Sequence, residues 1–70
     1  MSPATRPPRL TPGDRARAYL VGGRSADGVV IAIRHGRPVL RVHRADGVEE
    51  YELDARAGDR WERLPLRGRR

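Results

Sequence analysis

The chain has 70 residues, including 15 arginines, two histidines, no lysine and no cysteine, and its formal net charge is +6. This length allows one domain at most, and without cysteine there is neither a disulfide nor a thiolate metal site, so no metal or cofactor is expected. The chain has no apolar run of about 18 residues and no apolar signal region near its start, so we expect a cytoplasmic protein with no membrane partner.

Residues 1–12, MSPATRPPRLTP, hold four of the six prolines. This composition predicts a disordered or extended arm that buries little. Residues 15–21, RARAYLV, then alternate small or apolar residues with larger polar ones, which is typical of a strand. One face of this strand carries Ala16, Ala18 and Leu20, and we expect that face to be buried.

The remaining elements are short and separated by turn residues, and no window shows a helical period. After a glycine-rich loop at 22–28, strands are expected at 29–34, 38–44, 48–53 and 60–64. His35-Gly36 and Asp46-Gly47 are the expected hairpin turns, and residues 54–58 can form one helical turn. The pattern predicts an all-β fold of five strands.

Pairing the strands about these two turns predicts a register. Both hairpins, placed independently, assign Leu40 and Val42 to the same face, which supports the pairing. The predicted core face consists of Val29, Ile31, Ile33, Leu40, Val42, Tyr51 and Leu53.

On strand 38–44 the same register places a carboxylate opposite each basic residue. Arg41 is expected opposite Glu52, His43 opposite Glu50, and Arg44 opposite Glu49, as ordinary cross-strand pairs. Arg34 and Arg37 have no such partner and flank the His35-Gly36 turn, so this hairpin tip is predicted to attract an anion.

The order of these signals resembles a known fold family. Gly13-Asp14-Arg15 precedes a strand, a glycine-rich loop ends in Asp27-Gly28, a hairpin ends in Asp46-Gly47, and a short turn leads to the last strand. Over residues 12–64 this layout resembles the SH3-like small β-barrels, including Tudor-like and KOW-like modules and small actinobacterial domains of unknown function. The resemblance implies a five-stranded, strongly bent barrel that serves as a binding module.

The expected organisation is therefore a disordered arm at 1–12, an SH3-like barrel at 13–66 and a basic tail at 67–70. Five of the six excess positive charges lie in residues 1–9 and 67–70, so nucleic acid is the first expected partner. The abundance of arginine also fits the coding bias of a GC-rich bacterial genome, and both explanations stay open. The candidate nucleic-acid or anion contacts are Arg15, Arg17, Tyr19, Arg34, His35, Arg37, Arg67, Arg69 and Arg70.

The second hypothesis is a protein-interaction module or small regulator, which would dock through a sheet edge or through an apolar strip of Val30, Ala32 and Val39. No enzymatic activity is expected, because no nucleophile or general base has the partners that would orient it in a pocket. Trp61 is expected to be core or half-buried rather than a stacking platform. The predicted oligomeric state is a monomer or a weak homodimer.

Overall fold

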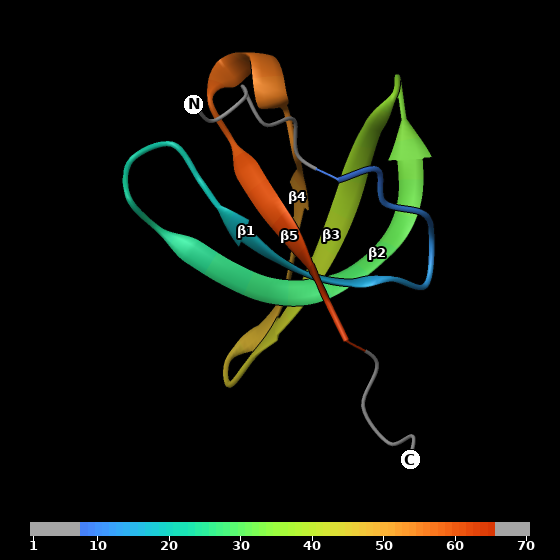
Figure 1. The fold of residues 1–70 in the computed structure, drawn as a ribbon. Coiled ribbons are helices and arrows are strands. Elements are labelled where there is room, and N and C mark those ends of the chain that lie inside the picture. The colour runs from blue at the N-terminus through green and yellow to red at the C-terminus, as the bar shows by residue number, and fades with distance from the viewer. Residues whose placement is uncertain (1–7, 66–70) are drawn as a thin grey trace.

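The structure is a computed structural model that describes residues 8–65, and it is all-β in this range (Figure 1). Five strands and one 3-10 turn follow each other along the chain. They are β1 (Arg15–Tyr19), β2 (Ser25–Arg34), β3 (Arg37–Arg44), β4 (Gly47–Glu52), η1 (Ala55–Ala57) and β5 (Arg60–Leu64). The predicted fold class, the number of strands and the single helical turn are confirmed.

All five strands belong to one antiparallel sheet in the order β4-β3-β2-β1-β5. The long β2 is strongly curved, and its first half pairs with β1 while its second half pairs with β3 (Figure 1). This order is compatible with an SH3-like fold. Within residues 8–65, however, β4 and β5 do not pair, so the sheet is not closed into a barrel.

The core lies inside the bend of this sheet. Ala16 and Ala18 of β1 are fully buried, as predicted from their alternation. Small residues there allow the two halves of the bent sheet to approach each other. The buried cluster consists of Leu10, Ala16, Ala18, Ala26, Val30, Leu40, Val42 and Leu53, with Leu20, Tyr51 and Trp61 packed against it.

The start of β2 differs from the prediction, because residues 25–28 are strand rather than loop. Gly28 is what permits this. A Cβ at this position would overlap the carbonyl group of Arg41 in β3. Glycine therefore allows β2 to cross β3 at very short range where the sheet bends.

The predicted register between β2 and β3 is confirmed near the turn and wrong beyond it. Arg34 pairs with Arg37 and Ile33 with Pro38, but a β-bulge lies between Val30 and Ala32. The bulge shifts the pairing by one residue, which exchanges the two faces of β2. Val30 is therefore buried, whereas Val29, expected in the core, is 37% exposed. Ile33, also expected in the core, is 43% exposed although it pairs with Pro38 as predicted, and Ile31 is half-buried.

The β3–β4 pairing is shifted by two positions from the prediction. The two turn residues are Ala45 and Asp46, because Arg44 pairs with Gly47. Of residues 44–47, only Gly47 has a positive φ. A shift of two leaves every side chain on its predicted face. Leu40, Val42 and Leu53 are accordingly buried and Tyr51 is half-buried, as expected.

The apolar strip predicted as a docking surface is not on the surface. Val30 is 1% exposed and Val39 2% exposed, while Ala32 is half-buried. The bulge turns Val30 into the core. The alternative hypothesis of docking through this strip is therefore wrong, although docking at a sheet edge is not affected.

Residues 8–12 also differ from the expected arm, because they pack onto the sheet. Leu10 is 3% exposed and belongs to the core cluster. The Trp61 indole Nε1–H donates to the Pro8 carbonyl oxygen at 2.7 Å, and Arg63 donates to the Arg9 carbonyl oxygen. The prolines of this segment predicted its lack of regular structure but gave no sign of its packing.

Candidate functional site

Three predicted contact residues share one surface, here called the β1 face, formed by Arg15, Arg17 and Tyr19 together with Asp27 and Glu62. Arg17 binds Asp27 through two hydrogen bonds, Nε to Oδ1 at 2.8 Å and Nη2 to Oδ2 at 3.1 Å. Its Nη1 lies 3.8 Å from Glu62 Oε2. The Tyr19 hydroxyl donates to the same Glu62 oxygen at 2.7 Å. The register explains these contacts, because Arg17 pairs directly with Asp27 on β2 and with Glu62 on β5.

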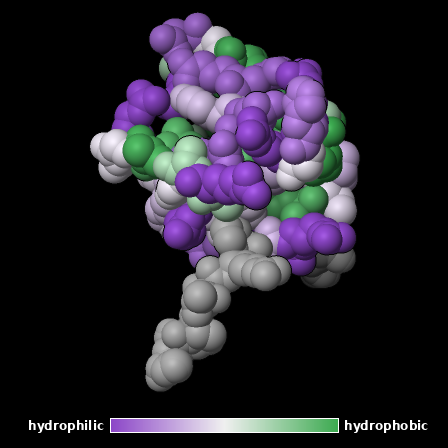
Figure 2. All heavy atoms as spheres, turned by 90° about the horizontal axis from the view of Figure 1, so that it is seen from above, coloured by the Kyte–Doolittle hydropathy of each residue, from purple (hydrophilic) through white to green (hydrophobic). Residues whose placement is uncertain are grey.

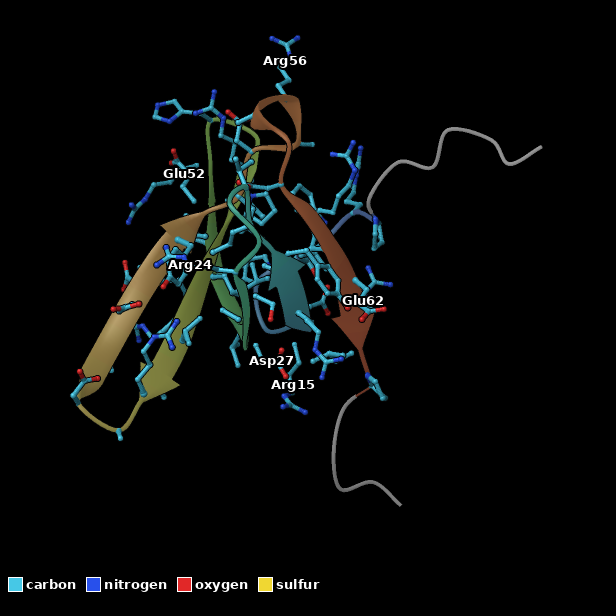
Figure 3. The ribbon with its side chains drawn as sticks, turned by 90° about the vertical axis from the view of Figure 1, so that its left-hand side faces the viewer. Arg15, Arg24, Asp27, Glu52, Arg56 and Glu62 are labelled. Carbon is cyan, nitrogen blue, oxygen red and sulfur yellow. The ribbon has the colours of Figure 1, made fainter. Side chains whose placement is uncertain are left out.

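These contacts change the proton affinities on the β1 face. The hydrogen bond from Arg17 lowers the pKa of Asp27, and Arg15 adds a smaller effect in the same direction. The hydrogen bond to Glu62 raises the pKa of the Tyr19 hydroxyl. The carboxylates of Asp27 and Glu62 are therefore already engaged by groups of this face. Figure 3 shows Arg15 and Asp27 close together and Glu62 on the neighbouring strand.

The predicted β2–β3 hairpin tip forms at the other end of the molecule. His35 and Gly36 have φ angles of 53° and 75°, the two positive values that a two-residue hairpin turn of the primed type requires. Histidine tolerates the left-handed region better than most residues, and glycine adopts it freely. The turn places Arg34, His35 and Arg37 on an exposed tip.

Arg37 is not without carboxylate partners, which corrects the prediction. Its Nη1 lies 3.5 Å from Glu52 Oε1, and its Nη2 lies 3.6 Å from Asp54 Oδ2. The two-position shift in the β3–β4 register brings Glu52 to this place. Arg34, by contrast, makes no ion pair within residues 8–65.

The β3–β4 side of the sheet also pairs its basic residues, in part with other partners than predicted. Arg41 binds Glu50 at 3.0 Å rather than Glu52, and Arg44 binds Glu49 at 2.9 Å as expected. His43 lies opposite Val48 instead of Glu50. The prediction that these arginines are structural is supported by their contacts.

η1 supplies a further arginine to the tip end. The Asp54 side chain caps the turn by accepting from the Arg56 N–H at 3.0 Å, and Gly58 ends it with a φ of 110°. The buried Asp59 carboxylate accepts the N–H of Asp54 and that of Val21, which fixes the turn against the β1–β2 loop. Arg56 projects from the turn away from the body of the molecule (Figure 3).

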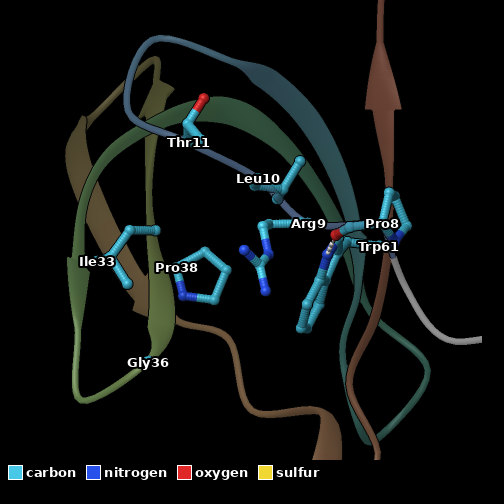
Figure 4. Close-up of a pocket in the computed structure, with 8 residues that line it drawn as sticks. All are labelled: Pro8, Arg9, Leu10, Thr11, Ile33, Gly36, Pro38 and Trp61. Carbon is cyan, nitrogen blue, oxygen red and sulfur yellow. Dashed lines mark hydrogen bonds between the residues drawn. The ribbon is translucent and has the colours of Figure 1, made fainter.

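Two adjoining hollows lie between the hairpin tip, η1 and residues 8–11, and we name the pair the Trp61 groove. Both hollows share Gly36, Pro38 and Trp61 as walls. The first, of about 570 Å³, is completed by Pro8, Arg9, Leu10, Thr11 and Ile33 (Figure 4). The second, of about 520 Å³, is completed by His35, Arg37, Leu53, Asp54, Ala55 and Arg56.

Trp61 is half-buried, and a hydrogen bond fixes one edge of its indole ring. Its indole N–H is satisfied by the Pro8 carbonyl group, and its ring packs against the core cluster while also lining both hollows. Figure 4 shows the Arg9 guanidinium between Pro38 and Trp61, inside the first hollow. The ring is therefore both a core residue, as expected, and a wall of the groove.

The arginines of residues 8–65 divide into two groups. Five of them, Arg17, Arg37, Arg41, Arg44 and Arg63, make ion pairs with described carboxylates. The six that make none in this range are Arg9, Arg15, Arg24, Arg34, Arg56 and Arg60. Two of these six, Arg9 and Arg56, line the Trp61 groove, and Arg34 precedes His35, a wall of the second hollow, on the hairpin tip. Seen from this end of the molecule, hydrophilic residues dominate the surface, with smaller hydrophobic patches between them (Figure 2).

Sequence reasoning thus located part of this groove. It selected Arg34, His35 and Arg37, but it missed Arg9 and Arg56 and gave Trp61 no role in binding. No local signal marks Arg9 or Arg56, because each reaches the groove only through the tertiary packing of residues 8–12 and of η1. The predicted contacts Arg67, Arg69 and Arg70 lie outside the described residues.

In the part of the chain that the structure describes, no helix has the length and apolarity needed to span a membrane. The same part contains no group of three or more side chains that could hold a metal ion. Comparisons with protein-family models, curated proteins and solved structures find no match for this chain. The fold defines a small all-β domain of five antiparallel strands, and the interpretation of the Trp61 groove depends on its own geometry.

Proposed function

We propose that the protein is a non-enzymatic binding module that takes single-stranded nucleic acid in the Trp61 groove. The observation that carries this proposal is the half-buried face of Trp61 between two hollows that Arg9 and Arg56 line. Aromatic rings beside a basic groove are the common means of holding single strands, because bases stack and phosphates bind arginine.

The distribution of ion pairs favours the Trp61 groove rather than the β1 face as the site of phosphate binding. Arg17 is engaged by Asp27 and Glu62, so it offers a phosphate less than an arginine without a carboxylate partner would. Residues 1–7 and 66–70 contain four further arginines and no acidic side chain. The tail arginines Arg67, Arg69 and Arg70 are proposed to add sequence-independent phosphate contacts.

The alternative is a protein-interaction module that adds a strand from a partner at β4 or β5. Each of these strands has one neighbour in the sheet, so each has an open edge within residues 8–65. Both edges carry charged side chains, three glutamates in β4 and Arg60, Glu62 and Arg63 in β5. Charged edge strands resist pairing with another chain, which makes this alternative the weaker one.

The test uses the intrinsic fluorescence of Trp61, the only tryptophan of the chain. A thymidine oligonucleotide of about 12 residues is titrated into the protein between roughly 50 and 200 mM salt. We expect the Trp61 emission to be quenched and the affinity to fall steeply with salt. No binding at the lowest salt overturns the proposal, and so does equal affinity for an acidic peptide such as oligoglutamate, which assigns the groove to protein ligands.

Two variants localise the binding. Trp61→Leu keeps an apolar side chain against the core but removes the stacking surface, so we expect about a tenfold loss of affinity or more. Because this variant has no tryptophan, its affinity and that of the original chain are compared by the fluorescence anisotropy of a dye-labelled thymidine oligonucleotide. A chain lacking residues 67–70 should retain quenching of Trp61 with a smaller salt dependence. Complete loss of binding in that shortened chain would show that the tail, and not the groove, is the site.

A further inference from the structure

The two hollows of the Trp61 groove differ in the number of charged side chains on their walls, one in the first (Arg9) and three in the second (Arg37, Asp54 and Arg56), and this difference indicates how a single strand would lie. The walls that belong to the first hollow alone are partly apolar, with Leu10 and Ile33 beside the shared Pro38. Those that belong to the second are mainly polar or charged, with His35 and Arg56 among them. A base suits the first environment and a phosphate group suits the second.

We propose that the first hollow accepts one unpaired base and that the second holds the phosphate next to it. This inference rests on the proposed function, because it assigns the parts of the ligand to the parts of the same groove. Each hollow has the volume of a typical small-molecule pocket, so a single base fits the first with room for its sugar at the mouth.

The position of Arg9 supports this assignment. Its guanidinium lies inside the first hollow between Pro38 and Trp61 (Figure 4), and it makes no ion pair within residues 8–65. A planar guanidinium can either stack on the face of a base or donate hydrogen bonds to the carbonyl oxygens at the edge of the base. Arg9 and Trp61 therefore present two π-compatible surfaces to one base.

The second hollow supplies charge at the place where the backbone would pass. Arg56 lines this hollow, extends outward from η1 at its mouth (Figure 3) and has no ion-pair partner among the described residues, and His35 lines the same hollow. Arg37 is shared between Glu52 and Asp54 at 3.5 and 3.6 Å, distances at which a phosphate can compete for the guanidinium. The strand must be unpaired, because a base held in a duplex cannot leave its stack without a cost of a few kcal/mol.

The decisive experiment compares two oligonucleotides of about six residues on the unaltered protein. One is oligothymidylate, and the other has the same sugar-phosphate backbone with abasic sites, so that every phosphate is retained. We expect the thymidine oligonucleotide to bind at least about tenfold more tightly and alone to quench Trp61 strongly. Equal affinity for the two overturns the base-in-hollow inference but leaves the proposed function intact, whereas failure of both to bind overturns the proposed function itself.

A matched pair of variants assigns the base to the first hollow. Ile33 and Val48 are both β-branched and exposed, at 43% and 54%, but only Ile33 lines the groove. Ile33→Thr should weaken oligothymidylate about threefold or more and leave the abasic backbone unchanged, while Val48→Thr should change neither. If Ile33→Thr weakens both ligands equally, the base does not enter the first hollow.

Discussion

The β1 face and the Trp61 groove are both rich in arginine, and the difference between them lies in the carboxylates. On the β1 face the register brings Asp27 and Glu62 opposite Arg17, so the positive charge is used within the sheet. In the groove, Arg9 and Arg56 come from a segment without regular structure and from a 3-10 turn, where no strand partner brings a carboxylate into place. Arg9 and Arg56 are therefore more available to a ligand than Arg17 is.

The largest expected effect comes from breaking the bend of β2, which joins these two regions. Gly28→Ala places a methyl group against the carbonyl of Arg41, and neither backbone can move without disturbing the sheet. Overpacking of this kind costs about 1–3 kcal/mol, which lowers Tm by roughly 5–20 °C in a domain of this size. Thermal unfolding followed by circular dichroism measures the change.

The control for this variant is Ser25→Ala, an exposed position on the same strand. It should leave Tm within about 2 °C of the original. If Gly28→Ala unfolds at the same temperature as Ser25→Ala, the close approach of β2 and β3 at this point is not a feature of the fold in solution.

The second prediction compares equal losses of charge in the two regions. Arg34→Ala with Arg56→Ala removes one positive charge from the hairpin tip and one from the groove, and Arg15→Ala with Arg17→Ala removes two from the β1 face. If the groove pair contacts two phosphates, the slope of log affinity against log salt falls by about 1.4, and affinity near 0.1 M salt falls about tenfold.

The β1-face pair should change both quantities by about half as much or less, because Arg17 is already engaged by carboxylates and only Arg15 makes no ion pair within residues 8–65. Fluorescence titrations of oligothymidylate at several salt concentrations measure both variants. Equal effects of the two pairs would mean that net charge alone drives binding and that the groove has no special part in it.

The third prediction tests whether an arginine of the β1 face becomes available to a ligand when its carboxylate partner is removed. Asp27→Asn removes the carboxylate that binds Arg17 at 2.8 Å, which frees the guanidinium. We expect affinity for oligothymidylate at low salt to rise about two- to threefold. Asp46→Asn is the matched control, because it removes the same charge from a turn where the carboxylate makes no ion pair in residues 8–65. An equal rise in both variants would attribute the gain to net charge.

The structure also shows how much of the fold could be predicted from the sequence. Alternation and turn residues predicted five strands, the His35-Gly36 turn and the buried face of β1, because each depends on neighbours in the chain. The face of β2 could not be predicted correctly, since the bulge beyond Val30 has no residue signature such as a glycine or proline at Ile31.

The residues of the Trp61 groove could likewise be predicted only in part. The tip residues Arg34 and His35 were identified because a turn exposes whatever flanks it. Arg9 was missed because the burial of Leu10 brings it to Trp61 across about 50 residues of chain. Arg56 was missed because it reaches the groove through the fold of η1, which Asp54 caps. This candidate site combines an N-terminal segment, a hairpin tip and the turn η1, and it can be recognised only in the folded structure.

The smallest expected effect is the pH dependence of stability that Asp27 contributes. The pKa of Asp27 lies below its ordinary value of 3.8 because Arg17 donates hydrogen bonds to the ionised carboxyl. The folded state therefore holds this proton less tightly than the unfolded state. The resulting stability is fully present above pH 3.8 and is lost as the pH falls through the lower, folded pKa.

Between about pH 5 and pH 2, Asp27→Asn should consequently show a shallower fall in Tm than Asp46→Asn. The difference should be a few degrees at most, because the ion pair is exposed and screened by solvent. Thermal unfolding at a series of pH values in low salt measures it, with the original chain as reference. Parallel curves for the two variants would mean that Asp27 does not hold Arg17 in solution, and the β1 face would then be as free to bind phosphate as the groove.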